Sequence, residues 1–203
     1  MLFPCLTVFL ILLSIFAFLR RRASRSAKER EEAFWDRESA ANNTRKADLD
    51  SVTYITVTPS DYPLGVCTDS EVSAHEEKLS SFQSLRMLNL NGLSNTDLKL
   101  KYGPQNLEAL SNYDLNFTSY EQWIYRYGSL LAEKGFENEA IHVLEKGIGL
   151  RTDLSGNYLL LGNLYQKSGR IVGIDSLISM AENLSDINRA STIKKLEAMK
   201  ETQ

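Results

Sequence analysis

The sequence predicts an all-α protein with one N-terminal transmembrane helix, a charged juxtamembrane linker and a stack of helix hairpins. Three observations lead to this prediction: an uncharged apolar run at the start, apolar residues at helical spacing from residue 71 onward, and two late stretches that share one pattern at a fixed offset. The chain has 203 residues, which is enough for one modest domain with additional segments.

Residues 1–19 are expected to form the transmembrane helix. Leu2 to Leu19 carry no charge, and a helix of this length rises about 27 Å, close to the thickness of the hydrocarbon core. Lys and Arg follow the run but do not precede it, and cationic flanks stay in the cytoplasm. We therefore expect a single-pass membrane protein with a cytoplasmic C-terminal domain. The alternative, a cleaved signal peptide, would need positive charge before the run.

The cationic residues after the apolar run can have two roles. They determine the topology, and they can also attract anionic lipid headgroups, at about 1 kcal/mol per residue near the surface. The candidate membrane-surface residues are Arg20, Arg21, Arg22, Arg25 and Lys28.

Residues 20–70 are expected to form a charged juxtamembrane helix and then an extended tether. The aromatic pair Phe34 and Trp35 is typical of a membrane-interface anchor, with docking on the later domain as the alternative. Further on, Pro59 and Pro63 exclude a helix, and the β-branched residues before them favour an extended chain. This tether is apolar enough to lie against the helical body.

Residues 71–118 are expected to form a helical N-terminal cap. Ser94, Asn95 and Thr96 are all candidate N-caps, and Pro104 can open a helix at its first turn. The first helix is expected to end at Asn91-Gly92, since glycine suits a left-handed C-cap. An apolar stripe predicts that helix, with members at Leu79, Phe82, Leu85 and Leu88.

Residues 119–185 contain one pattern written twice at an offset of 34 residues. Each copy has an apolar helical face, then a glycine that ends the helix, Gly135 or Gly169, and then a second apolar face. Such a short connection makes the two helices antiparallel. Small residues at Gly128 and Gly162 let the paired helices approach closely. Each hairpin leaves an apolar side uncovered, so stacking is expected to bury it.

The pattern resembles the tetratricopeptide repeat family, which is built from 34-residue helix–turn–helix units. Two departures are Ile174 at a small-residue position and the absence of the closing proline. The matching positions of the first unit are Ile124, Gly128, Leu131, Gly135, Ala140, Leu144 and Gly147, and those of the second are Tyr158, Gly162, Tyr165, Gly169, Ile174, Ile178 and Ala181.

The resemblance implies an α-solenoid with a concave groove lined by the first helix of each unit. Residues 186–203 are expected to cap it with an amphipathic helix, whose apolar face includes Ile187, Ala190, Ile193 and Leu196. By the resemblance, the partner-binding groove residues are Tyr125, Ser129, Glu133, Leu159, Asn163 and Gln166.

The leading functional hypothesis is a membrane-anchored protein–protein interaction module, a scaffold or assembly factor that binds a partner peptide or protein. The alternatives are a structural homo-oligomer without a client and a non-catalytic subunit of a membrane enzyme complex. No nucleophile–base pair or nucleotide fingerprint predicts an enzyme or a cofactor. The net charge of −3 argues against a nucleic-acid partner, and two cysteines and two histidines give no metal site.

Overall fold

The computed structural model describes the backbone of residues 2–201 and the side chains of residues 9–201. Within residues 2–201 all regular structure is helical, which confirms the predicted all-α class. The helices are α1 (Leu2–Asn42), η1 (Pro59–Asp61), α2 (Ser70–Glu77), α3 (Leu79–Phe82), α4 (Asn95–Tyr102), η2 (Pro104–Asn106), α5 (Leu107–Glu133), α6 (Glu137–Gly149), α7 (Ser155–Lys167), α8 (Ile171–Ala181) and α9 (Asp186–Glu201).

The chain divides into two compact units. Unit 1 consists of residues 1–49 and 94–107, so it holds α1, α4 and η2. Unit 2 consists of residues 50–93 and 108–203, so it holds the other helices and nearly all of α5. Each unit therefore joins segments that are far apart in the sequence.

Unit 1 is held together where the end of α1 meets α4. Glu38 accepts a hydrogen bond from Thr96 Oγ1 at 2.7 Å and pairs with Lys99, and Arg37 pairs with Asp97 at 2.5 Å. Of the three candidate N-caps, Ser94 is the one that caps α4, in a capping box with Asp97. These contacts fix α4 to the last turns of a 41-residue helix.

The apolar start of α1 is exposed where its side chains are described. Nine large hydrophobic residues between Phe9 and Leu19 are each at least 46% exposed. Within the described part of the chain, no helix combines the length and the apolar character that crossing a membrane requires. The predicted span also includes residues 1–8, whose side chains lie outside the described residues.

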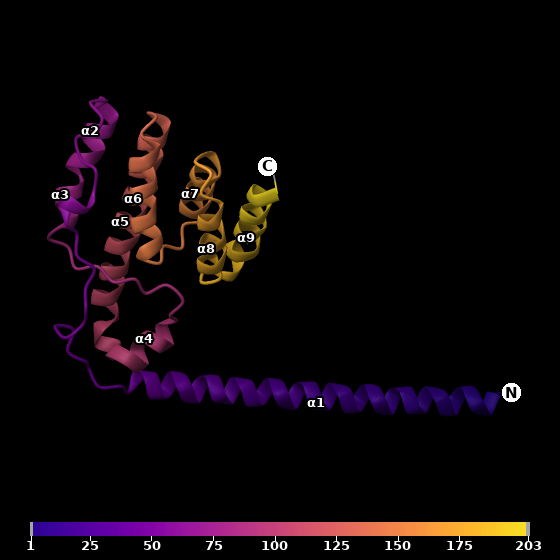
Figure 1. The fold of residues 1–203 in the computed structure, drawn as a ribbon. Helices are drawn as coiled ribbons and strands as arrows, with labels where there is room; N and C mark the ends of the chain where they lie inside the picture. Colours follow the sequence, from indigo (N-terminus) through magenta and orange to yellow (C-terminus); the bar gives the residue numbers. More distant parts are fainter. Residues whose placement is uncertain (1, 202–203) are drawn as a thin grey trace. The chain divides into compact units, whose positions relative to one another are not determined.

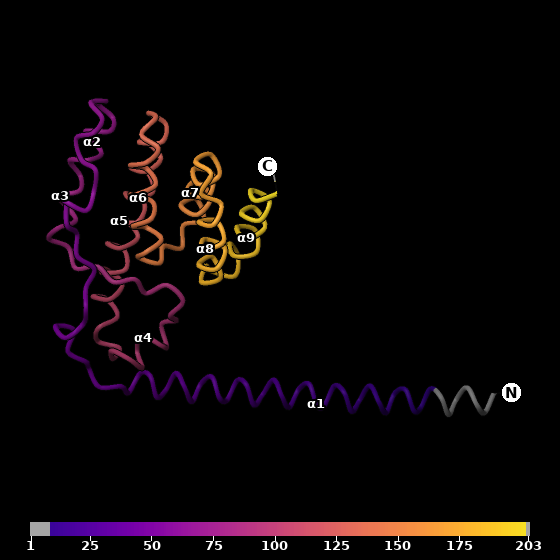
Figure 2. The backbone as a smooth tube through the Cα atoms, viewed as in Figure 1, coloured from indigo at the N-terminus to yellow at the C-terminus, as the bar shows by residue number. Residues whose placement is uncertain are grey.

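Unit 2 is a row of helical layers. Figure 1 shows α2 and α3, then α5 and α6, then α7 and α8, and finally α9, lying side by side. The turns at the tops of the two hairpins are visible in Figure 2. Gly135 and Gly169 occupy them with φ of 87° and 72°, which confirms the predicted helix ends. The arrangement is repeat-like, with one continuous apolar core through the row.

Two helix contacts depend on the absence of a side chain. A Cβ atom on Gly128 of α5 would lie 2.7 Å from Leu144 of α6. A Cβ atom on Gly162 of α7 would lie 2.7 Å from Leu196 of α9. The close approach expected at both glycines is therefore confirmed, although the partner of Gly162 comes from α9 as well as from α8.

Three expectations about the helices need correction or refinement. The helix predicted to end at Asn91-Gly92 ends at Phe82, because the following residues bond to distant segments: Ile55 N donates to Met87 O and Leu88 N donates to Tyr113 O. Leu85 is accordingly 38% exposed. The boundary placed between residues 118 and 119 falls inside the single helix α5.

The buried face of α9 also differs from the predicted stripe. Ile187 is 91% exposed, whereas Leu196 and the polar residue Thr192 are buried. The C-terminal half of α9 therefore packs on α7 and α8, because Leu196 and Met199 reach Gly162 there.

Candidate peptide-binding groove

Helix α5 is the central element of the candidate site because it contacts neighbours on three faces. Trp123 faces α2, and Gly128 faces α6. The third face lies toward α7. There the ring of Tyr125 lies so close to Gly156 of α7 that a Cβ atom added to Gly156 would be 2.9 Å from the ring. Residues four apart on a helix share a face, so Ser129 and Glu133 continue the stripe that begins at Tyr125.

The third face of α5 and the facing side of α7 form a pocket of about 340 Å³, which we call the α5–α7 groove. Its apolar wall consists of Ala132, Leu160 and the buried Leu164. Its polar wall consists of Glu133, Asn163, Gln166 and Lys167. The structure thus brings together three of the six residues predicted for the groove, Glu133, Asn163 and Gln166.

The other three predicted residues lie beside the groove and do not line it. Tyr125 and Leu159 are partly buried and pack against the core of unit 2. Ser129 is half-buried, and its hydroxyl donates to Glu133 Oε1 at 3.1 Å. Ser129 therefore orients a residue of the groove without lining it.

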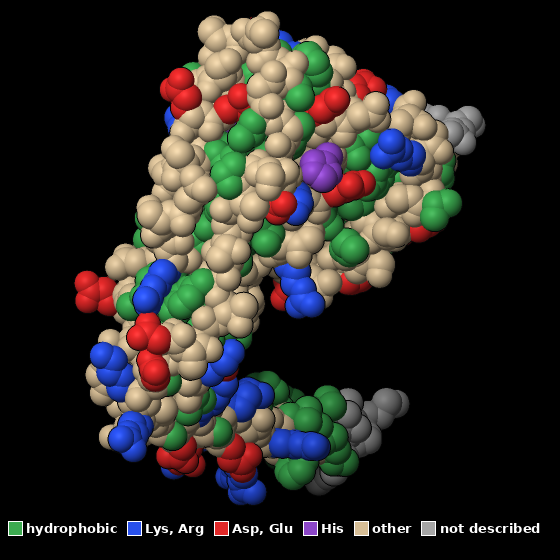
Figure 3. Space-filling view, turned by 60° about the vertical axis from the view of Figure 1, so that its left-hand side comes forward, with side chains coloured by type: hydrophobic (Ala, Val, Ile, Leu, Met, Phe, Trp, Pro, Cys, Tyr) green, Lys and Arg blue, Asp and Glu red, His purple; other side chains and the backbone are tan. Residues whose placement is uncertain are grey.

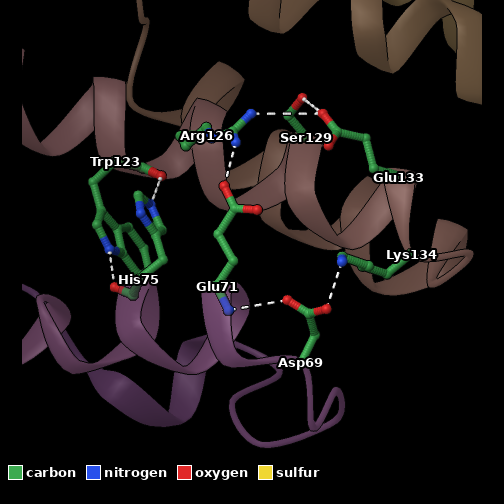
Figure 4. A network of polar contacts seen from close by, with 8 residues as sticks. All are labelled: Asp69, Glu71, His75, Trp123, Arg126, Ser129, Glu133 and Lys134. Atoms are coloured by element: carbon green, nitrogen blue, oxygen red, sulfur yellow. Dashed lines mark hydrogen bonds and ion pairs between the residues drawn. The ribbon is translucent and has the colours of Figure 1, made fainter.

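The charged groups of the groove are paired within the protein. Glu133 lies 3.6 Å from Arg126, which also contacts Glu71 at 2.6 Å, as Figure 4 shows. Lys167 lies 3.6 Å from Glu137 of α6. These pairs leave the groove with little net charge of its own.

The two amides in the groove differ in their availability. Gln166 Nε2 donates to Met199 O at 2.7 Å, so this end of the side chain is occupied by α9. Asn163 is exposed, and no described residue hydrogen-bonds to its side chain. An amide offers donors and an acceptor together, so Asn163 can bind both the N–H and the C=O of a peptide.

Helix α2 holds α5 from the other side through a reciprocal pair of hydrogen bonds. Trp123 Nε1 donates to His75 O at 2.8 Å, and His75 Nε2 donates to Trp123 O at 3.0 Å (Figure 4). Burial lowers the pKa of His75 and favours the neutral imidazole, which can still donate from Nε2 to the Trp123 carbonyl. Asp69 adds an ion pair to Lys134 at 2.5 Å, so α5 is fixed along most of the groove.

Residue Glu121 is a buried acid that sequence reasoning did not single out. It is 3% exposed and accepts a hydrogen bond from Thr152 Oγ1 at 2.8 Å, which ties α5 to the connection between α6 and α7. Burial raises the pKa of Glu121 to about 7. Its only sequence signal is an acid on the apolar side of the helix, next to Tyr120 and Ile124.

The predicted membrane-surface residues are all exposed on α1. Figure 3 shows blue cationic side chains next to green apolar ones along this helix. Lys28 forms an i, i+4 pair with Glu32 at 3.6 Å, while the four arginines point to solvent. The structure therefore leaves Arg20, Arg21, Arg22 and Arg25 accessible.

The chemistry of the α5–α7 groove is that of a binding surface. It offers apolar area, an amide and paired charges, and it holds no nucleophile next to a base. Among residues 9–201, no group of three or more His, Cys, Asp or Glu is placed to hold a metal ion. No protein-family model, curated protein or solved structure matches the chain.

Proposed function

We propose that the chain is a membrane-anchored protein–protein interaction module, a scaffold or assembly factor. It binds a partner peptide or protein through a tetratricopeptide-like groove between α5 and α7, on the cytoplasmic face of the membrane. The observation that carries the proposal is the α5–α7 groove itself, where the free amide of Asn163 lies over an apolar wall.

The make-up of the groove suits a peptide with a small apolar side chain. Leu160, Leu164 and Ala132 offer apolar surface, whose burial contributes about 25 cal/mol per Å². The Asn163 amide can pair with the peptide backbone. Because Glu133 and Lys167 are already paired, the groove has no strong preference for a charged ligand.

The anchor in this proposal is the N-terminal part of α1, with the span at Leu2 to Leu19. Support comes from the exposed apolar side chains of residues 9–19 and from the cationic residues that follow directly. The excess of Arg after the span favours a cytoplasmic position for the rest of the chain. A tether of this kind would keep the groove near the inner surface.

A structural homo-oligomer is the second candidate function. It is favoured by two exposed apolar residues on the last two helices, Val172 on α8 and Ile187 on α9, which are 81% and 91% exposed. Contact with a further copy could cover such residues. The role of a non-catalytic subunit in a membrane enzyme complex uses the same groove as the leading proposal and differs only in the partner.

Site-specific photocrosslinking tests the proposed groove. The full chain, expressed in its own cells, would carry p-benzoylphenylalanine at Lys167, an exposed residue that lines the groove, or, as the matched control, at the exposed Ser179 of α8. We expect crosslinks from Lys167 to one short segment of one partner, mapped by mass spectrometry, and at least about tenfold fewer from Ser179, because only the first position lies in the groove.

Other crosslinking outcomes would contradict the proposal. Equal crosslinking at the two positions would mean that the groove has no specific ligand. Crosslinks from Lys167 to a second copy of this chain would favour the homo-oligomer and exclude a client peptide in the groove.

A further inference from the structure

A second pocket lies where the extended segment before α2 crosses α5 and α6. It has a volume of about 390 Å³, which is in the range of small-ligand sites. Its walls come from Thr56, Asp61 and Tyr62 of the extended segment, from Tyr120 of α5, and from the C-terminal half of α6. None of its lining residues belongs to the α5–α7 groove, so the two sites are separate.

The wall formed by the extended segment is fixed to α6 at Asp61. His142 Nε2 donates to the Asp61 carbonyl oxygen at 3.0 Å. Lys146 Nζ contacts Asp61 Oδ2 at 2.9 Å. The Tyr62 ring also meets the Trp123 ring edge-on, with the centroids 5.1 Å apart. The pocket is therefore formed before any ligand arrives.

The charge in this pocket that is not neutralised is negative. Lys146 is paired with Asp61, which leaves the exposed carboxylate of Glu145. One Glu145 oxygen accepts a hydrogen bond from the Tyr165 hydroxyl at 2.7 Å, so its position is fixed while the carboxylate keeps further acceptor sites.

The unit around the pocket has the same sign of charge. Unit 2 holds 19 Asp and Glu against 12 Lys and Arg, a formal charge of −7. A surface with such an excess attracts cations and raises their association rate. Both the local carboxylate and the surrounding field therefore favour a cationic ligand.

A pair of buried tyrosines supplies a hydrogen-bond donor to the pocket. The hydroxyls of Tyr62 and Tyr120 hydrogen-bond to each other, and both side chains are more than nine-tenths buried. Burial raises the pKa of each, so both keep their protons. Two O–H groups share one mutual bond, and no other described residue accepts the second proton. A ligand with a carbonyl oxygen would accept it.

We infer that this pocket binds an arginine residue of a partner peptide, with the guanidinium at Glu145 and a peptide carbonyl at the Tyr62–Tyr120 pair. Arginine fits best because its planar fork of N–H donors matches a carboxylate and its face can stack on tyrosine rings. This site goes beyond the proposed groove, and either site can bind without the other.

Titration with a minimal peptide pair tests this inference. The probes are N-acetyl-arginine-N-methylamide and its neutral isostere N-acetyl-citrulline-N-methylamide, added to the full-length protein in detergent with ¹³C-labelled tyrosines. We expect saturable NMR shifts with the arginine probe and binding that is about three- to tenfold weaker with the citrulline probe, because citrulline lacks the charge that Glu145 attracts.

Two variants locate the bound cation. Glu145→Gln should weaken binding of the arginine probe by the same factor, roughly three- to tenfold, and should remove the preference for the arginine probe over the citrulline probe. Glu182→Gln makes the same charge change at an exposed residue of α8 and should leave binding unchanged. Asn163→Arg in the groove should also leave it unchanged, so failure of the groove proposal would not affect this result.

Three results would overturn the inference. They are the absence of saturable binding by the arginine probe, equal binding of the two probes, and an equal effect of Glu145→Gln and Glu182→Gln. Since Glu145 and Glu182 are both exposed, neither variant depends on a change in the core, and circular dichroism would verify that both stay folded.

Discussion

Trp123→Ala is expected to lower the free energy of unfolding of unit 2 by about 3–5 kcal/mol. Trp123 is 3% exposed, and its ring centroid lies 5.1 Å from those of Tyr62 and Tyr127. The substitution removes this packing and also the hydrogen bond from the indole to His75 O. Urea unfolding of the full chain in detergent, followed by far-UV circular dichroism, would measure the loss.

Two further variants separate the causes of this loss. Trp123→Phe keeps an aromatic ring but removes the N–H, so it should cost less, about 1–3 kcal/mol, because the part-buried carbonyl of His75 loses the indole donor and keeps only the bond from Lys78 N. Leu115→Ala changes an exposed residue of the same helix and should cost under about 0.5 kcal/mol. If Trp123→Ala lowered the free energy of unfolding no more than Leu115→Ala does, α2 would not pack on α5 as described.

Glu121→Gln is expected to stabilise the protein at pH 8 by about 3 kcal/mol and to have almost no effect near pH 4.5. Burial raises the pKa of Glu121 to about 7 in the folded state, against an ordinary value of 4.5. Between these values the folded protein keeps a proton that the unfolded chain releases. Stability of the wild type therefore falls as the pH rises from 4.5 to 7, and it levels off above that range.

Unfolding experiments from pH 4.5 to pH 8 would measure this effect. Glutamine has the shape of the neutral acid and can still accept from Thr152, so the variant should lose this part of the pH dependence. Glu108→Gln, at an exposed position of α5, is the matched control and should keep the wild-type profile. Parallel pH profiles of Glu121→Gln and the wild type would contradict a buried acid at this position.

The contribution of His75 to stability depends on pH with the opposite sign. Its pKa is lowered in the folded state, so the unfolded chain binds a proton first as the pH falls. Stability from His75 is therefore present above about pH 6.5 and is lost below it. In the wild type, the gain in stability from Glu121 as the pH falls offsets this loss. The Glu121→Gln variant lacks that gain, so unfolding experiments on the variant and the wild type separate the two contributions.

The turns of the hairpins could be predicted from the sequence because they depend on local chemistry. Gly135 and Gly169 take positive φ, which glycine adopts at low cost, and their spacing of 34 residues repeats the unit around them. Gly128 was predictable for a related reason: a small residue on an apolar face indicates close packing, and Leu144 occupies that space.

The path of residues 83–93 could not be predicted, because distant partners decide it. The apolar spacing there suits a helix, but the backbone bonds of Met87 and Leu88 go to Ile55 and Tyr113. The single-sequence pattern contains no information about such pairings. The same holds for the pocket at Tyr62 and Tyr120, which is made by segments almost 60 residues apart.

The α5–α7 groove could be predicted from the sequence only in part. Helical spacing places Ser129 and Glu133 on one face of α5, and Asn163 and Gln166 on one face of α7. Which of them line the groove depends on how the two helices pack, and the structure places Ala132 and Glu133 in its lining but not Ser129. The ion pair of Lys167 with Glu137 of α6, which neutralises one charge of the groove, is long-range and has no sequence signal.

Labelling of one exposed cysteine tests most directly whether the groove faces the cytoplasm and holds a partner. Lys167→Cys and the control Ser179→Cys, in a chain with Cys5→Ser and Cys67→Ala, would be treated with a membrane-impermeant maleimide in vesicles from the source cells. Both cysteines should react in inside-out vesicles only, and bound partner should slow the reaction of Lys167→Cys severalfold more than that of Ser179→Cys. Reaction in right-side-out vesicles, recovery of the protein outside the membrane fraction, or equal rates at the two positions would contradict the proposed function.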